Sequence, residues 1–267
     1  MALTDNIKDP DFTQISEKIL YFPGHANITV LNLDSNSLMI DCGRNINEAK
    51  AIKRITGDIF GNDIRYVALT HFHNDHTHSL PCFSDCDIIA SARVRKFLRS
   101  AKRKRIKECT ADWQQIPNIT FTADYVLKEA GYQILCKQTG GHTPDSCYVY
   151  SSGHKVLVAG DNLRSDFLWG GRNCNPDHWI SALKEFATLD ADYIIIGHGE
   201  ILTTENVKAV LDLTVEVKRR TESLLSQNVS DPEIIADVSK MKTPDKYGIF
   251  IHADTVPKWL KFWKNRI

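Results

Sequence analysis

The sequence predicts a layered α/β domain, of the mixed α+β kind, followed by a helical C-terminal extension. Short apolar runs with strand character alternate with helical stretches as far as Leu202. Several of these runs end in glycine followed by histidine or aspartate, which is how buried strands deliver polar side chains to a sheet edge. Beyond Leu202 the strand pattern fades and helical stretches follow. Alternation of this kind is typical of sheets covered by helices.

The first part of the chain predicts an antiparallel meander. Three extended runs, KILYFP, NITVLNL and SLMIDCG, begin at Lys18. Turn-forming residues separate them, Pro23-Gly24 after the first run and Asp34-Ser35-Asn36 after the second. Next, Asn45 can cap a helix from about Ile46 to Gly57, because apolar residues recur there at helical spacing.

The middle of the chain predicts further strands and helices in alternation. The segment RYVALT is an apolar strand that leads directly into a histidine-rich loop. The later predicted strands are CDIIA, TFT, YQILCK, CYVY, KVLVA and YIII. One predicted helix begins near Ala92, and another runs from about Pro176 to Leu189.

The last part of the chain predicts three helices, over Glu205–Leu225, Pro232–Met241 and Val256–Ile267. No Gly/Ser linker precedes them, so we expect these helices to pack on the core rather than to form a tethered unit. We therefore divide the chain into a main domain over residues 1–203 and a helical extension over residues 204–267.

The composition excludes several classes of protein. The 267 residues carry 33 basic and 33 acidic side chains, and 42% are hydrophobic. These values exclude a disordered or collagen-like chain and argue against binding of membranes or nucleic acid over most of the surface. Apolar runs such as VLVA stop far short of the ~20 residues that a membrane helix needs. With no visible secretory signal and seven scattered cysteines, we expect a cytoplasmic protein with reduced thiols.

The segment THFHNDHTH places four potential metal ligands within six positions: His71, His73, Asp75 and His76. The first two are two residues apart and would point to nearly opposite sides of a helix, so they can share an ion only in a turn. Asp75 and His76 are adjacent and diverge, which favours a second ion. The loop therefore predicts two metals, and its HxHxDH pattern is too dense to treat as chance.

Three more candidates follow predicted strands. His142 comes after YQILCKQTGG, Asp161 after KVLVAG, and His198 after YIIIG. Because side chains at the carboxyl ends of buried strands tend to converge, we expect these three to meet the histidine-rich loop. The preceding glycines should let the backbone turn sharply at each site: Gly140, Gly141, Gly160 and Gly197.

Together the segments HxHxDH, GHT, GD and GHG resemble the metallo-β-lactamase-fold hydrolase superfamily, from about Lys18 to Glu200. The early LMIDCG resembles the strand-ending Asp-x-Gly of that superfamily. The loop after Asp161 is most similar to glyoxalase-II-like and quinoprotein-relay-associated hydrolases. The resemblance implies a four-layer αββα sandwich of two mixed sheets, with a binuclear metal site at one sheet edge.

The resemblance also implies roles for individual residues. It implies seven metal ligands in two groups that share one carboxylate: His71, His73 and His142 for the first metal, Asp75, His76 and His198 for the second, and Asp161 between them. Asp75 and Asp161 would be the catalytic carboxylates. Asp41 and Thr70 match positions from which a hydrogen bond orients a ligand imidazole.

The ligand set predicts the chemistry. Imidazole and carboxylate ligands suit zinc first, with iron or manganese as alternatives. Two such cations about 3.5 to 4 Å apart would lower the pKa of a bridging water to roughly 7. The metal-bridging hydroxide would attack an ester, thioester, lactone or amide bond of a small molecule, with Asp161 orienting it. The sequence thus predicts a binuclear metal-dependent hydrolase.

The loop NLRSDFLWGGRN should lie beside the metals, because it directly follows Asp161. Trp169 is expected to form a pocket wall or to pack in the core. Arg172 would either bind a substrate carboxylate or lie on the surface as an ordinary arginine. The sequence does not specify the substrate, the native metal or the oligomeric state.

Nine basic residues between Arg93 and Lys107 support a different function. Val94, Phe97 and Leu98 mark one apolar face, so the stretch is first of all an amphipathic helix with a solvated basic side. Alternatively, the helix grips phosphates and the chain is a phosphodiesterase or nuclease of the same fold, although no additional nuclease domain is evident.

A mononuclear iron dioxygenase that acts on persulfides shares this fold and is the remaining enzymatic alternative. It would need only His71, His142 and Asp161. A non-catalytic scaffold is disfavoured, because all seven ligand positions are filled.

Overall fold

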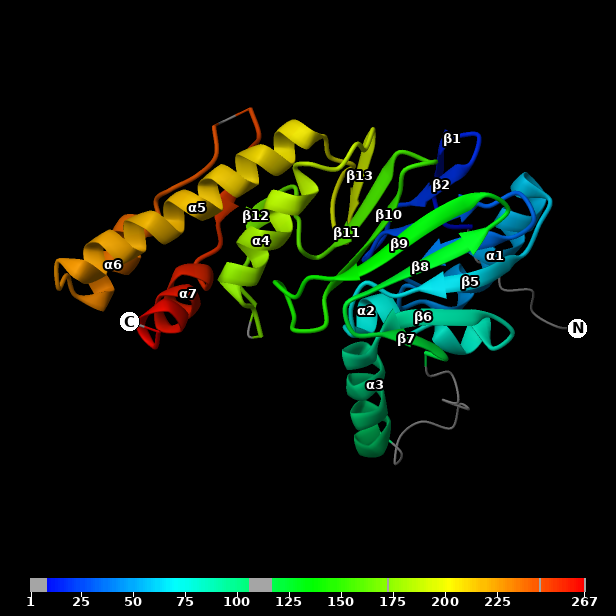
Figure 1. Ribbon diagram of the computed structural model, residues 1–267, viewed down its shortest axis with the longest axis horizontal. Helices are drawn as coiled ribbons and strands as arrows, with labels where there is room; N and C mark the ends of the chain where they lie inside the picture. The colour runs from blue at the N-terminus through cyan, green and yellow to red at the C-terminus, as the bar shows by residue number, and fades with distance from the viewer. Residues whose placement is uncertain (1–8, 106–116, 172, 245, 267) are drawn as a thin grey trace, which may run out of the picture.

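The computed structural model describes residues 9–105, 117–171, 173–244 and 246–266, with only the backbone for 101–105. Two β-sheets pack face to face, and helices cover the outer face of each (Figure 1). The four-layer αββα sandwich expected from the sequence is therefore confirmed.

The first sheet has seven strands in sequence order. They are β1 (Thr13–Ser16), β2 (Ile19–Phe22), β3 (Ile28–Asn32), β4 (Ser37–Ile40), β5 (Ile64–Ala68), β6 (Asp87–Ser91) and β7 (Ile119–Phe121). Strands β1 to β4 pair antiparallel and include the predicted meander, whereas β4 to β7 pair in parallel. Because parallel strands end at the same edge, the loops after β4, β5 and β6 meet there.

The second sheet has five strands in the order β13-β11-β10-β9-β8. They are β8 (Asp124–Glu129), β9 (Tyr132–Gln138), β10 (Cys147–Ser151), β11 (Val156–Gly160) and β13 (Tyr193–Ile196), and only β11 and β13 pair in parallel. Strand β8 was not predicted from the sequence. Leu127 is the one fully buried side chain of this edge strand, so its apolar pattern is weak.

Alternating side chains of the strands fill separate apolar layers. Leu31 and Ile40 face the space between the sheets, where Val149 and Val158 of the second sheet meet them. The neighbouring Met39 points the other way, into the layer beneath α1 and α3. This alternation fixes which side chains each strand end presents.

Helix α1 (Ile46–Phe60) begins as predicted, since the Asn45 side chain accepts hydrogen bonds from the N–H groups of Asn47 and Glu48. The expectation that the helix ends at Gly57 was wrong. The helix continues to Phe60, and the following Gly61, with a φ of 70°, supplies a left-handed cap. Shorter elements and two further helices follow: α2 (Asn74–Thr77), the 3-10 turn η1 (Leu80–Phe83), α3 (Ala92–Arg105) and α4 (Pro176–Phe186).

The C-terminal part adds α5 (Thr204–Ser226), α6 (Asp231–Val238) and α7 (Thr255–Lys264), which lie beyond α4 in Figure 1. Their apolar side chains share one cluster with α4 and the second sheet, and the Trp259 ring lies 5.9 Å from that of Trp179. Strand β14 (Phe250–Ile251) pairs in parallel with β12 (Phe167–Leu168), a contact the sequence did not reveal. No helix within the described ranges is long and apolar enough to span a lipid bilayer.

Candidate metal centre

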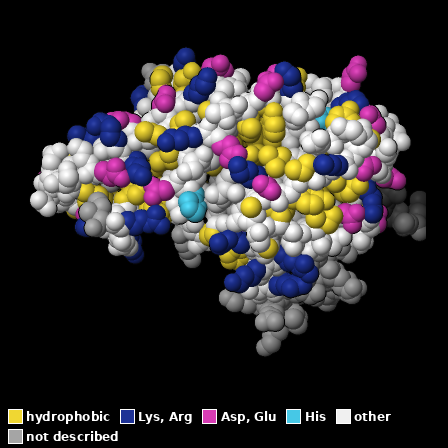
Figure 2. Space-filling model, viewed as in Figure 1, with side chains coloured by type: hydrophobic (Ala, Val, Ile, Leu, Met, Phe, Trp, Pro, Cys, Tyr) yellow, Lys and Arg dark blue, Asp and Glu magenta, His cyan; other side chains and the backbone are white. Residues whose placement is uncertain are grey.

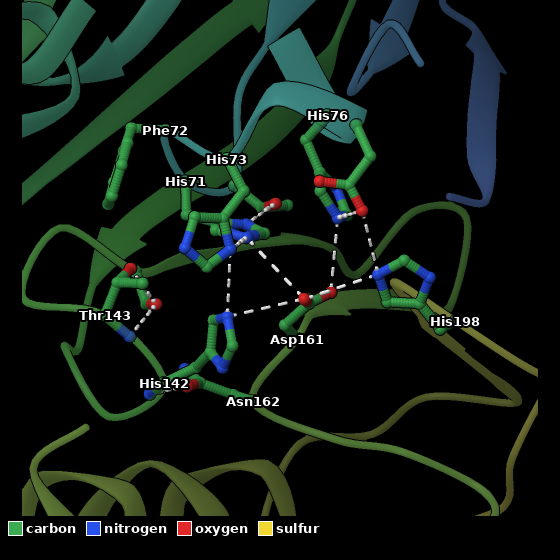
Figure 3. A network of polar contacts seen from close by, with 12 residues as sticks. His71, Phe72, His73, His76, His142, Thr143, Asp161, Asn162 and His198 are labelled. Carbon is green, nitrogen blue, oxygen red and sulfur yellow. Dashed lines mark hydrogen bonds and ion pairs between the residues drawn. The ribbon is translucent and has the colours of Figure 1, made fainter. Parts of the chain in front are cut away.

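Side chains from separate stretches of chain converge at the edge where strands of both sheets end (Figure 3). The structure brings together all seven side chains that the sequence singled out: His71 and His73 after β5, Asp75 and His76 on α2, His142 after β9, Asp161 after β11, and His198 after β13. The two histidines after β5 lie in an irregular loop before α2, as their spacing required.

The first group contains three imidazoles and one carboxylate: His71, His73, His142 and Asp161. Nδ1 of His73 lies 3.0 Å from Nε2 of His71 and 3.2 Å from Nε2 of His142. The Asp161 carboxylate approaches the same space, with Oδ2 3.4 Å from Nε2 of His142. Donor atoms from four side chains therefore face one another at a single point.

The second group contains Asp75, His76 and His198. Oδ2 of Asp75 lies 3.3 Å from Nε2 of His198 and 3.7 Å from Nε2 of His76. Asp161 stands between the two groups, since its Oδ1 is 3.3 Å from Nε2 of His76 and its Oδ2 is 3.4 Å from Nε2 of His198. One carboxylate thus contacts both sets of donors.

Asp41 anchors this arrangement from behind. Its carboxylate accepts hydrogen bonds of 2.8 Å from both the backbone N–H and the hydroxyl of Thr70. Its Oδ2 also lies 2.7 Å from Nδ1 of His76, while the Thr70 hydroxyl is 3.1 Å from Nδ1 of His71. Because the Nδ1 atoms face Asp41 and Thr70, the Nε2 atoms of both rings point into the cluster.

A profile that describes metallo-beta-lactamase proteins matches residues 21–198, which run from β2 to the histidine after β13. The protein belongs to the metallo-beta-lactamase superfamily. The superfamily resemblance that the sequence motifs indicated is therefore confirmed.

Curated relatives in this superfamily are distant. The chain is 25% identical over 228 residues to the lactamase-like protein notP of Aspergillus sp. strain MF297-2, covering 80% of this chain and 65% of that protein. It is 25% identical over 231 residues to the atrochrysone carboxyl ACP thioesterase nsrC of Aspergillus novofumigatus, covering 80% and 64%. The chain therefore spans slightly less than two thirds of the length of either relative.

Solved structures share the fold. A sec-alkylsulfatase, Pisa1 of Pseudomonas sp., superposes with a TM-score of 0.76 at 16% identity, covering 96% of this chain and 50% of that one. A metallo-beta-lactamase from Pontibacter korlensis gives a TM-score of 0.64 at 17% identity, covering 77% of this chain and 99% of that one.

Burial keeps the first group of imidazoles neutral. It lowers the pKa of His71 well below the ordinary histidine value and lowers the pKa of His142 to about 4. Burial also lowers the pKa of His73. Neutral imidazole is the form that binds a metal, so these rings have the protonation state of ligands near neutral pH.

The second group is dominated by its carboxylates. Burial opposes protonation of His198, but hydrogen bonds to Asp161 and Asp75 outweigh it and raise the pKa to about 9. Burial likewise opposes ionisation of Asp75, yet the hydrogen bond from His198 and the charge of His76 bring its pKa down to about 2. The imidazoles also hold the pKa of the buried Asp161 well below its usual range, so this carboxylate is ionised.

The residues fit a pair of divalent cations. Nε2 of His76 and Oδ1 of Asp161 are buried in the described structure without a hydrogen-bond partner, although each faces the cluster. Buried polar atoms rarely stay unsatisfied, so the pair indicates a bound group. Imidazole nitrogens and carboxylate oxygens are ligands that zinc, iron and manganese accept.

The residue before His198 must be glycine for a reason other than the sharp turn predicted for Gly197. Its φ does not lie in the left-handed range, but a Cβ atom there would overlap Oδ1 of Asp161 and lie 3.0 Å from Cε1 of His76. A side chain is therefore excluded at Gly197 because the backbone after β13 passes so close to the cluster. Gly141, with a φ of 101°, does have the predicted turn conformation.

Sequence reasoning missed two residues that support the cluster. Asn162 accepts a hydrogen bond of 2.8 Å from the His142 N–H and donates one of 3.0 Å to the Gly140 carbonyl. Its position directly after Asp161 was the only available signal. His25 lies in the turn between β2 and β3, with its ring 3.9 Å from the Asp75 carboxylate and its carbonyl accepting a hydrogen bond from Nδ1 of His198. No motif marks it.

Aromatic rings flank the cluster. The Trp169 ring lies 5.6 Å from that of His142, next to the first group, and its role as a pocket wall stays a prediction. On another side the Phe72 ring lies 4.8 Å from that of His73. Arg172, the other predicted substrate residue, lies outside the described residues.

Proposed function

We propose that the protein is a binuclear metal-dependent hydrolase, with zinc as the first candidate metal, that cleaves a thioester or a related ester, lactone or amide bond of a small molecule. The observation that carries this proposal is the position of Asp161 between two complete groups of donors. His71, His73 and His142 would hold one cation, and Asp75, His76 and His198 the other. Bound together, such cations supply Lewis acidity and lower the pKa of a water to near neutrality.

The protein's own side chains would do the positioning. The ionised Asp161 can orient the attacking water and accept its proton, because its Oδ1 faces the cluster and accepts no hydrogen bond in the described structure. Asp75 contributes the second carboxylate at the His198 side. Asp41 and Thr70 fix two imidazoles behind the cluster, so little reorganisation is needed when substrate arrives.

The thioester class is supported by one named relative, the ACP thioesterase of Aspergillus novofumigatus, which is 25% identical. The site is also suited to an acyl substrate, since Phe72 and Trp169 place apolar rings beside the His73 and His142 imidazoles. Aromatic walls with a few polar groups are typical of small-molecule pockets.

The mononuclear iron alternative is less well supported. It needs only His71, His142 and Asp161, whereas His73 and the complete second group share the same space. A cytoplasmic location is also a proposal, supported by six described cysteines that are all free thiols.

The test is metal analysis of the purified protein together with a substrate panel of thioester, lactone, β-lactam and bis-nitrophenyl phosphate compounds. We expect close to two metal ions per chain and hydrolysis of the thioester. Turnover of the phosphodiester alone would replace the proposal with a phosphodiesterase. Oxygen consumption with a persulfide, together with one iron per chain, would replace it with the dioxygenase.

A further inference from the structure

A basic hollow lies between α3 and β7, outside the metal centre. It measures about 520 Å³ and is lined by Ala92, Arg95, Lys96, Arg99, Ser100 and Thr120. Among the described residues, this lining contains three cationic side chains and no carboxylate. Three other hollows, of about 390, 460 and 480 Å³, each include a carboxylate in their lining, such as Asp212, Glu200 and Asp34 respectively.

The cations of this hollow have no acidic partner among the described residues. Within the described ranges, no ion pair joins Arg95, Lys96 or Arg99 to a carboxylate, and Nε of Arg95 is buried without a hydrogen-bond partner. Several cations elsewhere do pair with a carboxylate, such as Arg220 with Asp237 at 2.8 Å. Figure 2 shows Lys and Arg side chains gathered where α3 leaves the body of the molecule. In a chain with zero net charge, this is a local positive field.

The helix that carries the hollow also contacts residues next to the candidate metal ligands. The Phe97 ring stacks on that of Phe72 with centroids 4.5 Å apart, and Phe72 lies between two of the candidate ligands in sequence. At the start of α3, the Ser91 hydroxyl donates a 3.2 Å hydrogen bond to the Asp145 carbonyl, in the turn that follows His142. A ligand held on α3 would therefore lie close to the loops that form the centre.

We propose that the hollow binds the phosphate groups of the carrier arm of a thioester substrate, a phosphorylated pantetheine such as that of coenzyme A or of a carrier protein. This inference rests on the proposed thioester hydrolysis. Guanidinium and ammonium groups bind phosphate through charge-assisted hydrogen bonds, and the hydroxyls of Ser100 and Thr120 are further donors. The volume is in the range of small-ligand sites, whereas a nucleic-acid strand would need cations spread along a path.

The first measurement is calorimetric binding of coenzyme A and of pantetheine, which lacks the phosphates. We expect the wild-type protein to bind coenzyme A at least tenfold more tightly than pantetheine. The double variant Lys96→Glu/Arg99→Glu should lose that preference, while Lys96→Arg should keep it. Lys50→Glu is the matched control, because Lys50 is an exposed helical cation of α1, away from the hollow. Circular dichroism checks that each variant is folded.

The second measurement is hydrolysis of one acyl group carried on coenzyme A, on a phosphopantetheinylated carrier protein, and on N-acetylcysteamine. The double variant should raise KM about tenfold or more for the phosphorylated carriers and less than twofold for N-acetylcysteamine. A larger effect on the carrier-protein thioester than on the coenzyme A thioester identifies the carrier protein as the source of the phosphate.

The outcomes separate the two proposals. If the double variant binds coenzyme A as tightly as the wild-type protein and the N-acetylcysteamine thioester is hydrolysed, the proposed phosphate site is wrong and the proposed hydrolase activity stands. If the double variant binds coenzyme A more weakly than the wild-type protein but no thioester is hydrolysed, the phosphate site stands and the proposed thioesterase activity is wrong. Tighter binding of a single-stranded oligonucleotide than of coenzyme A, lost in the same variant, would make the surface a nucleic-acid site instead.

Discussion

The carboxylate of Asp41 holds the imidazole of His76 through a contact of 2.7 Å between Oδ2 and Nδ1, and both side chains are almost completely buried. Asp41 has a φ of 58°, a left-handed conformation that is uncommon for aspartate, at the point where β4 ends. The strained backbone and the buried ion pair occur together because this residue ties the end of β4 to the histidine-rich loop.

Asp41→Asn should weaken metal binding by about 10- to 100-fold, because the amide cannot hold the His76 ring as firmly and no longer carries the charge. The measurement is competition with a chelator, followed by metal analysis. Asp190→Asn, at a carboxylate that is 80% exposed, is the control and should bind metal like the wild-type protein. Equal metal affinity in all three proteins would remove the orienting role of Asp41.

Asp161→Asn should leave the fold intact and reduce kcat by about 10²- to 10⁴-fold, since the group that orients the water and takes its proton is lost. The assay is steady-state hydrolysis of the thioester at matched metal content, with circular dichroism to verify folding. A variant that holds its full metal complement and still turns over at the wild-type rate would contradict this role.

Gly197→Ala should disrupt the centre, because the added Cβ would overlap the Asp161 carboxylate. We expect loss of at least one metal ion per chain and of most activity, although the residue contributes no side chain of its own. Gly57→Ala is the control, since no atom lies within 4 Å of its Cβ position inside α1. That substitution should stabilise the protein by about 0.5 to 1 kcal/mol and leave metal content unchanged. Normal metal content in Gly197→Ala would refute the close-approach argument.

The metal centre could be anticipated from sequence because its residues follow local patterns. The HxHxDH loop and the strand ends before His142, Asp161 and His198 each place a polar group by a rule that involves only nearby residues. The position of His25 could not be predicted by such rules, because its distance to Asp75 depends on how the β2–β3 turn folds over the sheet edge.

Strand pairing between segments far apart in the sequence could not be predicted either. Strands β12 and β14 have two residues each and come from positions more than 80 residues apart, so neither has a periodicity to detect. The edge strand β8 was missed because Val126, one of its apolar residues, faces solvent. The division of the chain at residue 203 stays a prediction, although Thr203 is the N-cap of α5.

Thr255 joins the C-terminal extension to the loop that carries Trp169. Its hydroxyl donates a 2.8 Å hydrogen bond to the Leu168 carbonyl and accepts one of 3.0 Å from the Gly170 N–H, and the residue is fully buried. Thr255→Val should lower the free energy of unfolding by about 1 to 3 kcal/mol, because the buried Gly170 N–H loses its partner and the Leu168 carbonyl keeps only the His252 N–H.

Because those groups flank Trp169, Thr255→Val should also raise KM while kcat changes less. Denaturant titration and steady-state kinetics measure the two effects. Thr221→Val is the matched control, since the Thr221 hydroxyl is equally buried but only bonds back to the Val217 carbonyl within its own helix. An unchanged KM in Thr255→Val would show that the C-terminal extension does not affect substrate binding through the loop that carries Trp169.

Asp145 carries a pH dependence that does not involve the candidate ligands directly. The side chain is fully buried, and burial raises its pKa to about 6, against weaker opposing effects from Thr143 and Arg93. A carboxyl group with a raised pKa binds its proton more tightly in the folded state than in the unfolded state. Its contribution to stability is therefore fully present below pH 3.8 and is lost as the pH rises through 6.

Asp145→Asn should consequently raise the free energy of unfolding by about 3 kcal/mol at pH 7.5, since the cost of burying an ionised carboxylate disappears. The gain should shrink as the pH falls from 7 to 4, where the wild-type side chain becomes neutral. Urea titrations of both proteins across this range provide the measurement, with Asp190→Asn as an exposed control that should show no such trend. A gain that is independent of pH would show that the amide acts through packing or hydrogen bonding, because only the ionisation of Asp145 predicts convergence of the two proteins at low pH.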